Sequence, residues 1–186
     1  MTYILMAVMA VLIIAADQIT KYLTIRNIAP TISENYISFV QKIGEVFHFD
    51  TSIYSTMEKK TTFIPNFLSF SHHHNDGGAW SMFSGAIWLF IIVFALFAVF
   101  IVWEFSKKRM PFTTFERFCI VAVFAGGLGN MIDRLRLGFV IDMIETEFIE
   151  FPIFNVADIF ITCGCILLIF HLVFFNKEFW KDEKKQ

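Results

Sequence analysis

Two aspartates flank the start of the last long apolar run of the chain. Asp142 lies in segment 138–144, and Asp158 stands one turn into the run from Phe154 to Phe175. Carboxylates in such a setting are expensive and usually functional. Two of them held close together tend to share one proton. The ionised member can then activate water while the protonated member donates a hydrogen bond to a carbonyl oxygen, which is the chemistry of an aspartic protease.

The spacing of this pair also fits a protein without hydrolytic activity. A polar aspartate in a membrane bundle serves as often as a structural hydrogen-bonder or a proton-relay group. Asp17, Asp133 and Asp158 are the candidates for such a proton path or polar core. A proton relay needs acids at several depths of the membrane. The long apolar runs described below contain few polar residues in the halves that are expected to lie on the cytoplasmic side, apart from Thr162 and His171. This observation weakens the proton-relay interpretation, whereas a catalytic role and a structural role for the pair both stay open at this point.

The composition indicates an integral membrane protein organised as a single membrane domain over residues 1–186. The chain is 56% hydrophobic, contains 25 Phe and has a mean hydropathy of +0.63, outside the usual range of soluble domains. Apolar runs predict transmembrane helices over about residues 3–25, 85–105, 115–133 and 154–175, each near the roughly 20 residues that cross a bilayer. The first run lacks a basic n-region, so we expect a retained span. A net charge of −2 without a basic patch argues against a nucleic-acid partner.

Four spans place both termini on one side of the membrane. Lys and Arg are frequent in loop 104–117 and in the C-terminal tail, whereas hairpin 133–153 is mainly acidic. The basic sides are therefore expected to be cytoplasmic. Segment 27–84 lies on the other side, and its Thr, Ser, Phe and Ile content from Thr31 to Phe70 favours short strands. The predicted fold is a mainly α membrane protein with four transmembrane helices and a small extracytoplasmic β-rich cap between the first two.

The polar residues of the spans converge at the outer membrane level. Asp17 and Lys21 are four residues apart, so they share a helix face and are expected to pair. Asp133 and Arg134 end the third span, where the arginine can either lock a carboxylate or grip a substrate carbonyl or phosphate. Glycines in segment 126–129 allow another backbone to approach closely. Scattered structural polar residues would not converge in this way.

Two further groups of residues have simpler explanations. His72, His73 and His74 suggest a metal site with Asp76, but three consecutive side chains of one strand cannot all point inward. A solvated or locally hydrogen-bonded run is therefore favoured. The acids of segment 145–150 lie further along the outer hairpin and are expected to meet water.

The order of the polar motifs closely resembles that of lipoprotein signal peptidase, the signal peptidase II family of bacterial aspartic endopeptidases. Five motifs match in family order: Asp17-Gln18-Ile19-Thr20-Lys21, segment 75–81, Gly129-Asn130-Met131-Ile132-Asp133-Arg134, Val140-Ile141-Asp142-Met143-Ile144 and Phe154-Asn155-Val156-Ala157-Asp158. The resemblance covers all of the chain except segment 31–70. Gly78 stands where the family usually has Ala, and the segment before Asn75 is longer than expected for the family.

The resemblance implies an enzyme of the bacterial cytoplasmic membrane that needs neither a metal nor an organic cofactor. Its substrate would be a prolipoprotein with a diacylglyceryl-modified cysteine, cut on the N-terminal side of that cysteine. We expect a monomer surrounded by membrane lipid, with its active site near the outer leaflet surface. By motif position, the roles fall as follows: catalytic, Asp142 and Asp158; substrate-binding, Asn75, Gly77, Asn130, Arg134 and Asn155; supporting, Asp17, Lys21 and Asp133.

Overall fold

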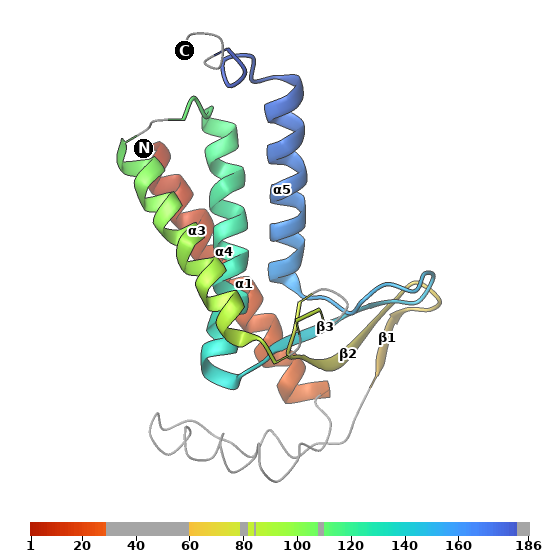
Figure 1. Ribbon diagram of the computed structural model, residues 1–186. Helices are drawn as coiled ribbons and strands as arrows, with labels where there is room; N and C mark the ends of the chain where they lie inside the picture. The colour runs from red at the N-terminus through yellow and green to blue at the C-terminus, as the bar shows by residue number, and fades with distance from the viewer. Residues whose placement is uncertain (29–59, 79–81, 84, 108–109, 182–186) are drawn as a thin grey trace.

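The helices of the protein form one bundle (Figure 1). The computed structural model describes residues 1–28, 60–78, 82–83, 85–107 and 110–181. Its long helices are α1 (Thr2–Ile28), α3 (Ile87–Lys107), α4 (Thr114–Leu137) and α5 (Val156–Phe174). All four are long and apolar enough to cross a membrane. α4 is the most buried of them and packs against the other three. α1 begins and α5 ends at the same end of the bundle, and the β-sheet lies at the other end.

Local sequence signals fix the ends and the packing of α4. Thr113 and Glu116 form a reciprocal capping box at its N-terminus, which satisfies two otherwise unpaired backbone N–H groups. Gly138 ends the helix with φ of 85°, a conformation that glycine adopts without strain. In the middle of the helix, a Cβ on Gly126 would lie 2.5 Å from the carbonyl oxygen of Ala157. The absence of a side chain there allows α4 and α5 to approach closely.

The sheet contains three antiparallel strands in the order β1 (Thr61–Ile64), β2 (Leu68–Asn75) and β3 (Val140–Thr146). β2 pairs with β3 so that His73 lies opposite Asp142, and the register shifts between Phe70 and His73. In Figure 1 the sheet runs sideways from the end of the bundle, and its hairpin tips lie beyond α5. The sheet is therefore built by two segments of the chain, the one between α1 and α3 and the one between α4 and α5.

The fold expected from the sequence is confirmed in its main features, four apolar helices and a small sheet. β3 was not expected, since hairpin 133–153 was interpreted as a loop. The strands predicted within residues 31–59 lie outside the described residues. The sheet is joined to the bundle by an apolar cluster composed of Ile25 of α1, Leu137 of α4, and Ile141 and Met143 of β3.

Buried polar side chains also gather at the bundle end opposite the sheet. Glu104 accepts a hydrogen bond of 2.7 Å from Arg117 Nη1. Glu116 accepts one of 2.7 Å from Asn176 Nδ2 and lies 2.8 Å from His171 Nδ1. Both glutamates are fully buried, and their contacts join α3, α4, α5 and the segment after α5.

Candidate active site

The two aspartates come from different elements that meet at the sheet end of the bundle. Asp142 belongs to β3 and is 1% exposed, whereas Asp158 is the third residue of α5 and is half-buried. Asn155 caps α5: it accepts the backbone N–H of Asp158 at 3.0 Å and donates its own backbone N–H to Asp158 Oδ2 at 3.1 Å. This capping box fixes Asp158, and the positive end of the helix dipole stabilises a negative charge there.

Two asparagines hold the carboxyl group of Asp142. Asn155 Nδ2 donates to Asp142 Oδ1 at 2.6 Å, and Asn75 Nδ2 donates to Oδ2 at 2.9 Å. Asn75 lies on the neighbouring strand, and its own Oδ1 accepts the backbone N–H of Gly77 at 3.0 Å. Asn155 therefore contacts both aspartates and brings β3 and α5 together.

The surroundings of Asp142 favour its neutral form. Burial is the main cause and the nearby charge of Asp158 is the second; together they raise the pKa of Asp142 to about 7. The two asparagine donors and the charge of Lys21 act in the opposite direction, since they stabilise the carboxylate. Near neutral pH, this carboxyl group can therefore exist in both protonation states.

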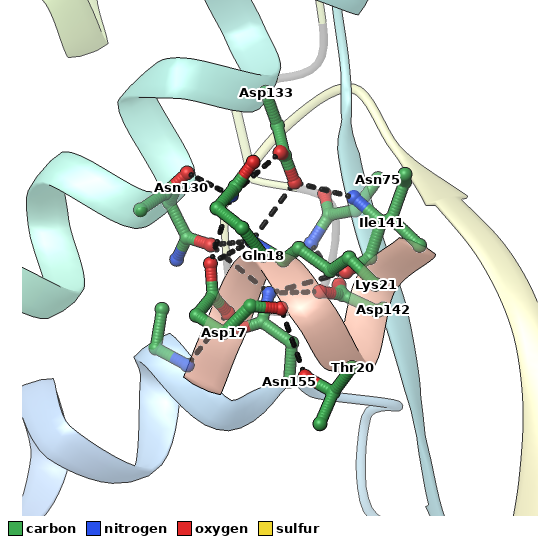
Figure 2. A network of polar contacts seen from close by, with 12 residues as sticks. Asp17, Gln18, Thr20, Lys21, Asn75, Asn130, Asp133, Ile141, Asp142 and Asn155 are labelled. Atoms are coloured by element: carbon green, nitrogen blue, oxygen red, sulfur yellow. Dashed lines mark hydrogen bonds and ion pairs between the residues drawn. The ribbon is translucent and has the colours of Figure 1, made fainter. Parts of the chain in front are cut away.

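A buried network connects Asp142 to α1 and α4 (Figure 2), and Asp158 joins it through Asn130. Asn130 Nδ2 donates to Asp158 Oδ1 at 2.7 Å, and Asn130 Oδ1 accepts from Lys21 Nζ at 2.9 Å. Lys21 also forms ion pairs of 2.8 Å with Asp17 and with Asp133. The pairing of Asp17 with Lys21 predicted from their spacing is thus present, and it belongs to a larger network.

Asp17 and Asp133 also hold backbone groups of the elements that carry Asp142 and Asp158. Asp17 Oδ1 accepts the backbone N–H of Ala157 in the first turn of α5 at 3.0 Å. Asp133 Oδ2 accepts the backbone N–H of Ile141 in β3 at 3.3 Å. Gly129 provides the space for this arrangement, because a Cβ there would lie 2.6 Å from Asp17 Oδ2. The positions of α5 and β3 therefore depend on buried side chains of α1 and α4.

Arg134 reaches the turn that follows β2. Its Nη2 donates to the carbonyl oxygen of Gly77 at 2.5 Å, and its guanidinium lies 4.2 Å from the centre of the Phe90 ring. A cation above an aromatic face is attracted by the ring. The sequence predicted that Arg134 either locks a carboxylate or binds a substrate group. In the structure it holds a backbone carbonyl, that of Gly77, rather than a carboxylate.

A cavity of about 470 Å³ opens at the two aspartates. Asn75, Asn130 and Arg134 contribute polar groups to its wall. The rest of the wall is mainly apolar and comes from segment 151–154 and from α5, including Ile159 and Ile161. Asn155 and Gly77 are buried beside this cavity and contact residues that line it: Asn155 donates to Asp142, and the carbonyl oxygen of Gly77 accepts from Arg134.

Two residues of the network were not singled out from the sequence. Gln18 Nε2 donates to Asp17 Oδ2 and to Asp133 Oδ1, both at 3.1 Å, so it joins the two carboxylates that Lys21 also bridges. Phe90 packs on Arg134. The position of Gln18 inside the first matched motif could have indicated its role. No pattern in the sequence distinguishes Phe90 from the other phenylalanines of the spans.

The histidine run and the outer acids lie outside this network. The rings of His72 and His74 contact each other, with centroids 4.7 Å apart, and burial lowers the pKa of His72 to about 4, helped by the neighbouring histidines. In the described part of the chain, no three His, Cys, Asp or Glu side chains gather as a metal site would require. Lys60 pairs with Glu145 at 2.8 Å and with Glu147 at 3.3 Å at the exposed edge of the sheet.

A model of the family described as signal peptidase (SPase) II matches residues 9–174. The chain belongs to the signal peptidase II family. It is 37% identical to a lipoprotein signal peptidase of Lactobacillus johnsonii over 174 residues, which cover 92% of this chain and 93% of the relative. A lipoprotein signal peptidase of Enterococcus faecalis is 35% identical over 166 residues, 89% of this chain and 86% of the relative.

Solved structures agree with the family. One bacterial membrane enzyme is 29% identical and superposes with a TM-score of 0.72, covering 98% of this chain and 93% of its own. A second is 30% identical with a TM-score of 0.69, covering 92% of this chain and 94% of its own. Signal peptidase II enzymes are proteases that remove signal peptides from prolipoproteins, so this chain is a multi-pass membrane protease of lipoprotein processing.

Proposed function

We propose that this signal peptidase II is an aspartic endopeptidase in which Asp142 and Asp158 form the catalytic dyad. One observation carries the proposal: two carboxyl groups from separate elements are held by shared asparagines at the wall of a largely apolar cavity. The bond cut would be the one on the N-terminal side of a diacylglyceryl-modified cysteine in the prolipoprotein.

The surroundings of the two aspartates support different roles for them. Asp158 accepts hydrogen bonds from Asn130 and from the backbone of Asn155, and it stands at a helix N-terminus, where negative charge is favoured. It is therefore suited to be the base. The pKa of Asp142 is raised to about 7, so this residue is suited to carry the proton and to act as the acid.

The reaction then follows from these assignments. Asp158 accepts a proton from a water molecule as the water oxygen bonds to the scissile carbonyl carbon, and Asp142 donates a hydrogen bond to the carbonyl oxygen. When the tetrahedral intermediate collapses, the carbon–nitrogen bond breaks and the proton held by Asp158 passes to the leaving amine of the cysteine. The products are a signal peptide with a new carboxylic acid, which releases its proton to water, and a lipoprotein with a free N-terminal amine.

The cavity wall is compatible with a lipid-modified substrate. Its apolar part runs along α5 through Ile159, Ile161 and Cys163, whose neighbours on the helix face outward as exposed apolar side chains. An acyl chain can lie against such a surface without leaving an apolar environment. The proposed enzyme is a monomer in the bacterial cytoplasmic membrane, with cytoplasmic termini and the dyad near the outer leaflet surface. Its chemistry requires neither a metal nor a cofactor.

Cleavage by Asp142→Asn and Asp158→Asn variants tests the dyad. Each variant is purified, checked for folding by thermal unfolding, and assayed in lipid vesicles with a diacylglyceryl-modified prolipoprotein. We expect a loss of at least a thousandfold in kcat for both variants, because neither amide can exchange a proton with the substrate. Glu150→Gln removes an exposed carboxylate and serves as the matched control with wild-type activity. Substantial cleavage by either folded aspartate variant would refute the dyad.

Two companion measurements examine the substrate and the mechanism. Mass spectrometry of the product is expected to show the lipidated cysteine as its first residue, and the same precursor without the diacylglyceryl group is expected to be cut poorly. Activity should persist in EDTA. Loss of activity in EDTA followed by recovery with zinc would replace the aspartic mechanism with a metal-dependent one.

A further inference from the structure

All three N–H donors of the Lys21 ammonium group have acceptors in the network next to the proposed dyad. It is fully buried, and its Nζ lies 2.8 Å from Asp17 Oδ2, 2.8 Å from Asp133 Oδ2 and 2.9 Å from Asn130 Oδ1. A lysine ammonium has three N–H donors and no acceptor. Each donor therefore has one partner, and the group facing it from Asn130 must be the amide oxygen.

This contact fixes which way the Asn130 amide faces (Figure 2). Its Oδ1 also accepts from Asn155 Nδ2 at 3.0 Å, so two donors converge on it. The other end of the amide, Nδ2, then faces Asp158 Oδ1 at 2.7 Å. An asparagine amide turned by half a rotation has almost the same shape but exchanges donor for acceptor. The donors on the Lys21 side select one of these two orientations.

We propose that Lys21 is a positioning residue: by orienting the Asn130 amide, it determines which aspartate of the dyad is ionised and which carries the proton. An N–H group presented to Asp158 binds its ionised form. In the opposite orientation, Asn130 would present its oxygen to Asp158 and would bind the protonated form, so the proton would move to the wrong aspartate. Lys21 thus keeps Asp158 as the base and leaves the proton with Asp142. This inference rests on the proposed aspartic mechanism.

Charged and titratable groups on three other elements lie near the proposed dyad. They are Asp17 and Lys21 of α1, His73 of β2, which is paired with Asp142 in the β-ladder, and Asp133 and Arg134 of α4. Any replacement of Lys21 changes this field as well as the hydrogen bond to Asn130. A test must therefore keep the charge change constant while the hydrogen bond is altered.

Lys21→Gln and Lys21→Met provide that comparison, because both remove one positive charge. The glutamine amide can still donate to Asn130 Oδ1, whereas the methionine side chain cannot. We expect the low-pH limb of kcat, which reports ionisation of the base, to lie about 1 to 2 pH units higher in Lys21→Met than in Lys21→Gln, the size of one hydrogen bond to a charged group. KM is expected to match in the two variants, because Lys21 does not line the cavity.

Thr24→Val is the structural control on α1. Thr24 is buried one turn after Lys21, and its hydroxyl donates only to the backbone oxygen of Thr20. This variant is expected to lower the unfolding temperature without moving the pH profile. Coincident pH profiles for folded Lys21→Met and Lys21→Gln would overturn the proposal and leave Lys21 with a purely structural role.

Asn130→Asp keeps the proposal testable if Lys21→Met does not fold. The new carboxylate retains an oxygen for Lys21 and places a second oxygen against Asp158, which then holds a proton between the two carboxylates. We expect a low-pH limb at least 1 pH unit above that of the wild type and a kcat at pH 6 reduced at least tenfold. An unshifted limb would overturn the proposal. Failure of the dyad itself is separate, because it appears as cleavage by Asp142→Asn or Asp158→Asn.

Discussion

The ionisation of Asp142 makes a stability prediction that does not depend on activity. Its pKa rises from 3.8 to about 7 in the folded protein, which corresponds to about 4 kcal/mol at 1.36 kcal/mol for each pKa unit. The unfolded chain loses this proton near pH 4, whereas the folded protein keeps it until about pH 7. The folded state therefore binds the additional proton in this window, and its stability falls as pH rises from about 4 to 7.

Asp142→Asn removes this pH-dependent loss and adds a fixed cost. Both carboxyl oxygens of Asp142 accept from asparagine side chains, Asn75 and Asn155, but an amide has only one oxygen, so the variant loses about 1 to 3 kcal/mol at every pH. We expect Asp142→Asn to be less stable than the wild type near pH 4 and more stable above pH 7. The change between these limits should approach about 4 kcal/mol.

Thermal unfolding followed by tryptophan fluorescence in nanodiscs measures this difference between pH 4.5 and 8.5. At roughly 2 to 4 °C for each kcal/mol in a chain of this size, the difference in Tm between variant and wild type should change by about 10 °C across the range. Glu150→Gln, which removes an exposed carboxylate, is expected to follow the wild-type curve. A difference in Tm that stays constant with pH, or that favours the variant most at low pH, would refute the reasoning.

The structure leads to three other predictions. Gly129→Ala forces a methyl group against the carboxylate of Asp17 and should cost about 1 to 3 kcal/mol of stability; an unchanged Tm would contradict this packing. Glu104→Ala leaves Arg117 without its ion-pair partner and should lower stability by about 3 to 5 kcal/mol without changing KM, whereas a raised KM would connect the far end of the bundle to the substrate. In the wild type, kcat should fall as pH rises above about 7, where Asp142 loses its proton, and a profile that stays flat to pH 9 would show that this proton is not needed.

Features that depend on local sequence could be predicted. The four helices follow from apolar runs of sufficient length, because the bilayer sets that length. The Asp17–Lys21 pair follows from helical spacing. The Asn155–Asp158 capping box is a local pattern as well, because its two residues are three positions apart at the start of a helix.

Features that depend on contacts between distant segments could not be predicted. The pairing of β2 with β3 joins residues such as His73 and Asp142 that are far apart in the chain, and neither strand has a strong pattern of its own. Glu104 and Glu116 fall within the predicted loop 104–117, but both are fully buried: Glu104 pairs with Arg117 of α4, and Glu116 contacts the α4 cap and the segment after α5. Individual hydrogen bonds of the site, such as those of Gln18, depend on where three helices and a strand meet.

The alternation of side chains along β3 has a consequence for the position of Asp142. Successive residues of a strand point to opposite faces, so a slip of one residue exchanges the two faces. Such a slip would turn Asp142 away from α5 and would bring Ile141 and Met143 out of the apolar cluster in which they are buried. The burial of Ile141 and Met143 in the apolar cluster therefore keeps the carboxyl group of Asp142 directed toward α5. β2 carries one extra residue within segment 71–72, where the register shifts, and this bulge absorbs the mismatch without moving Asp142 from its place opposite His73.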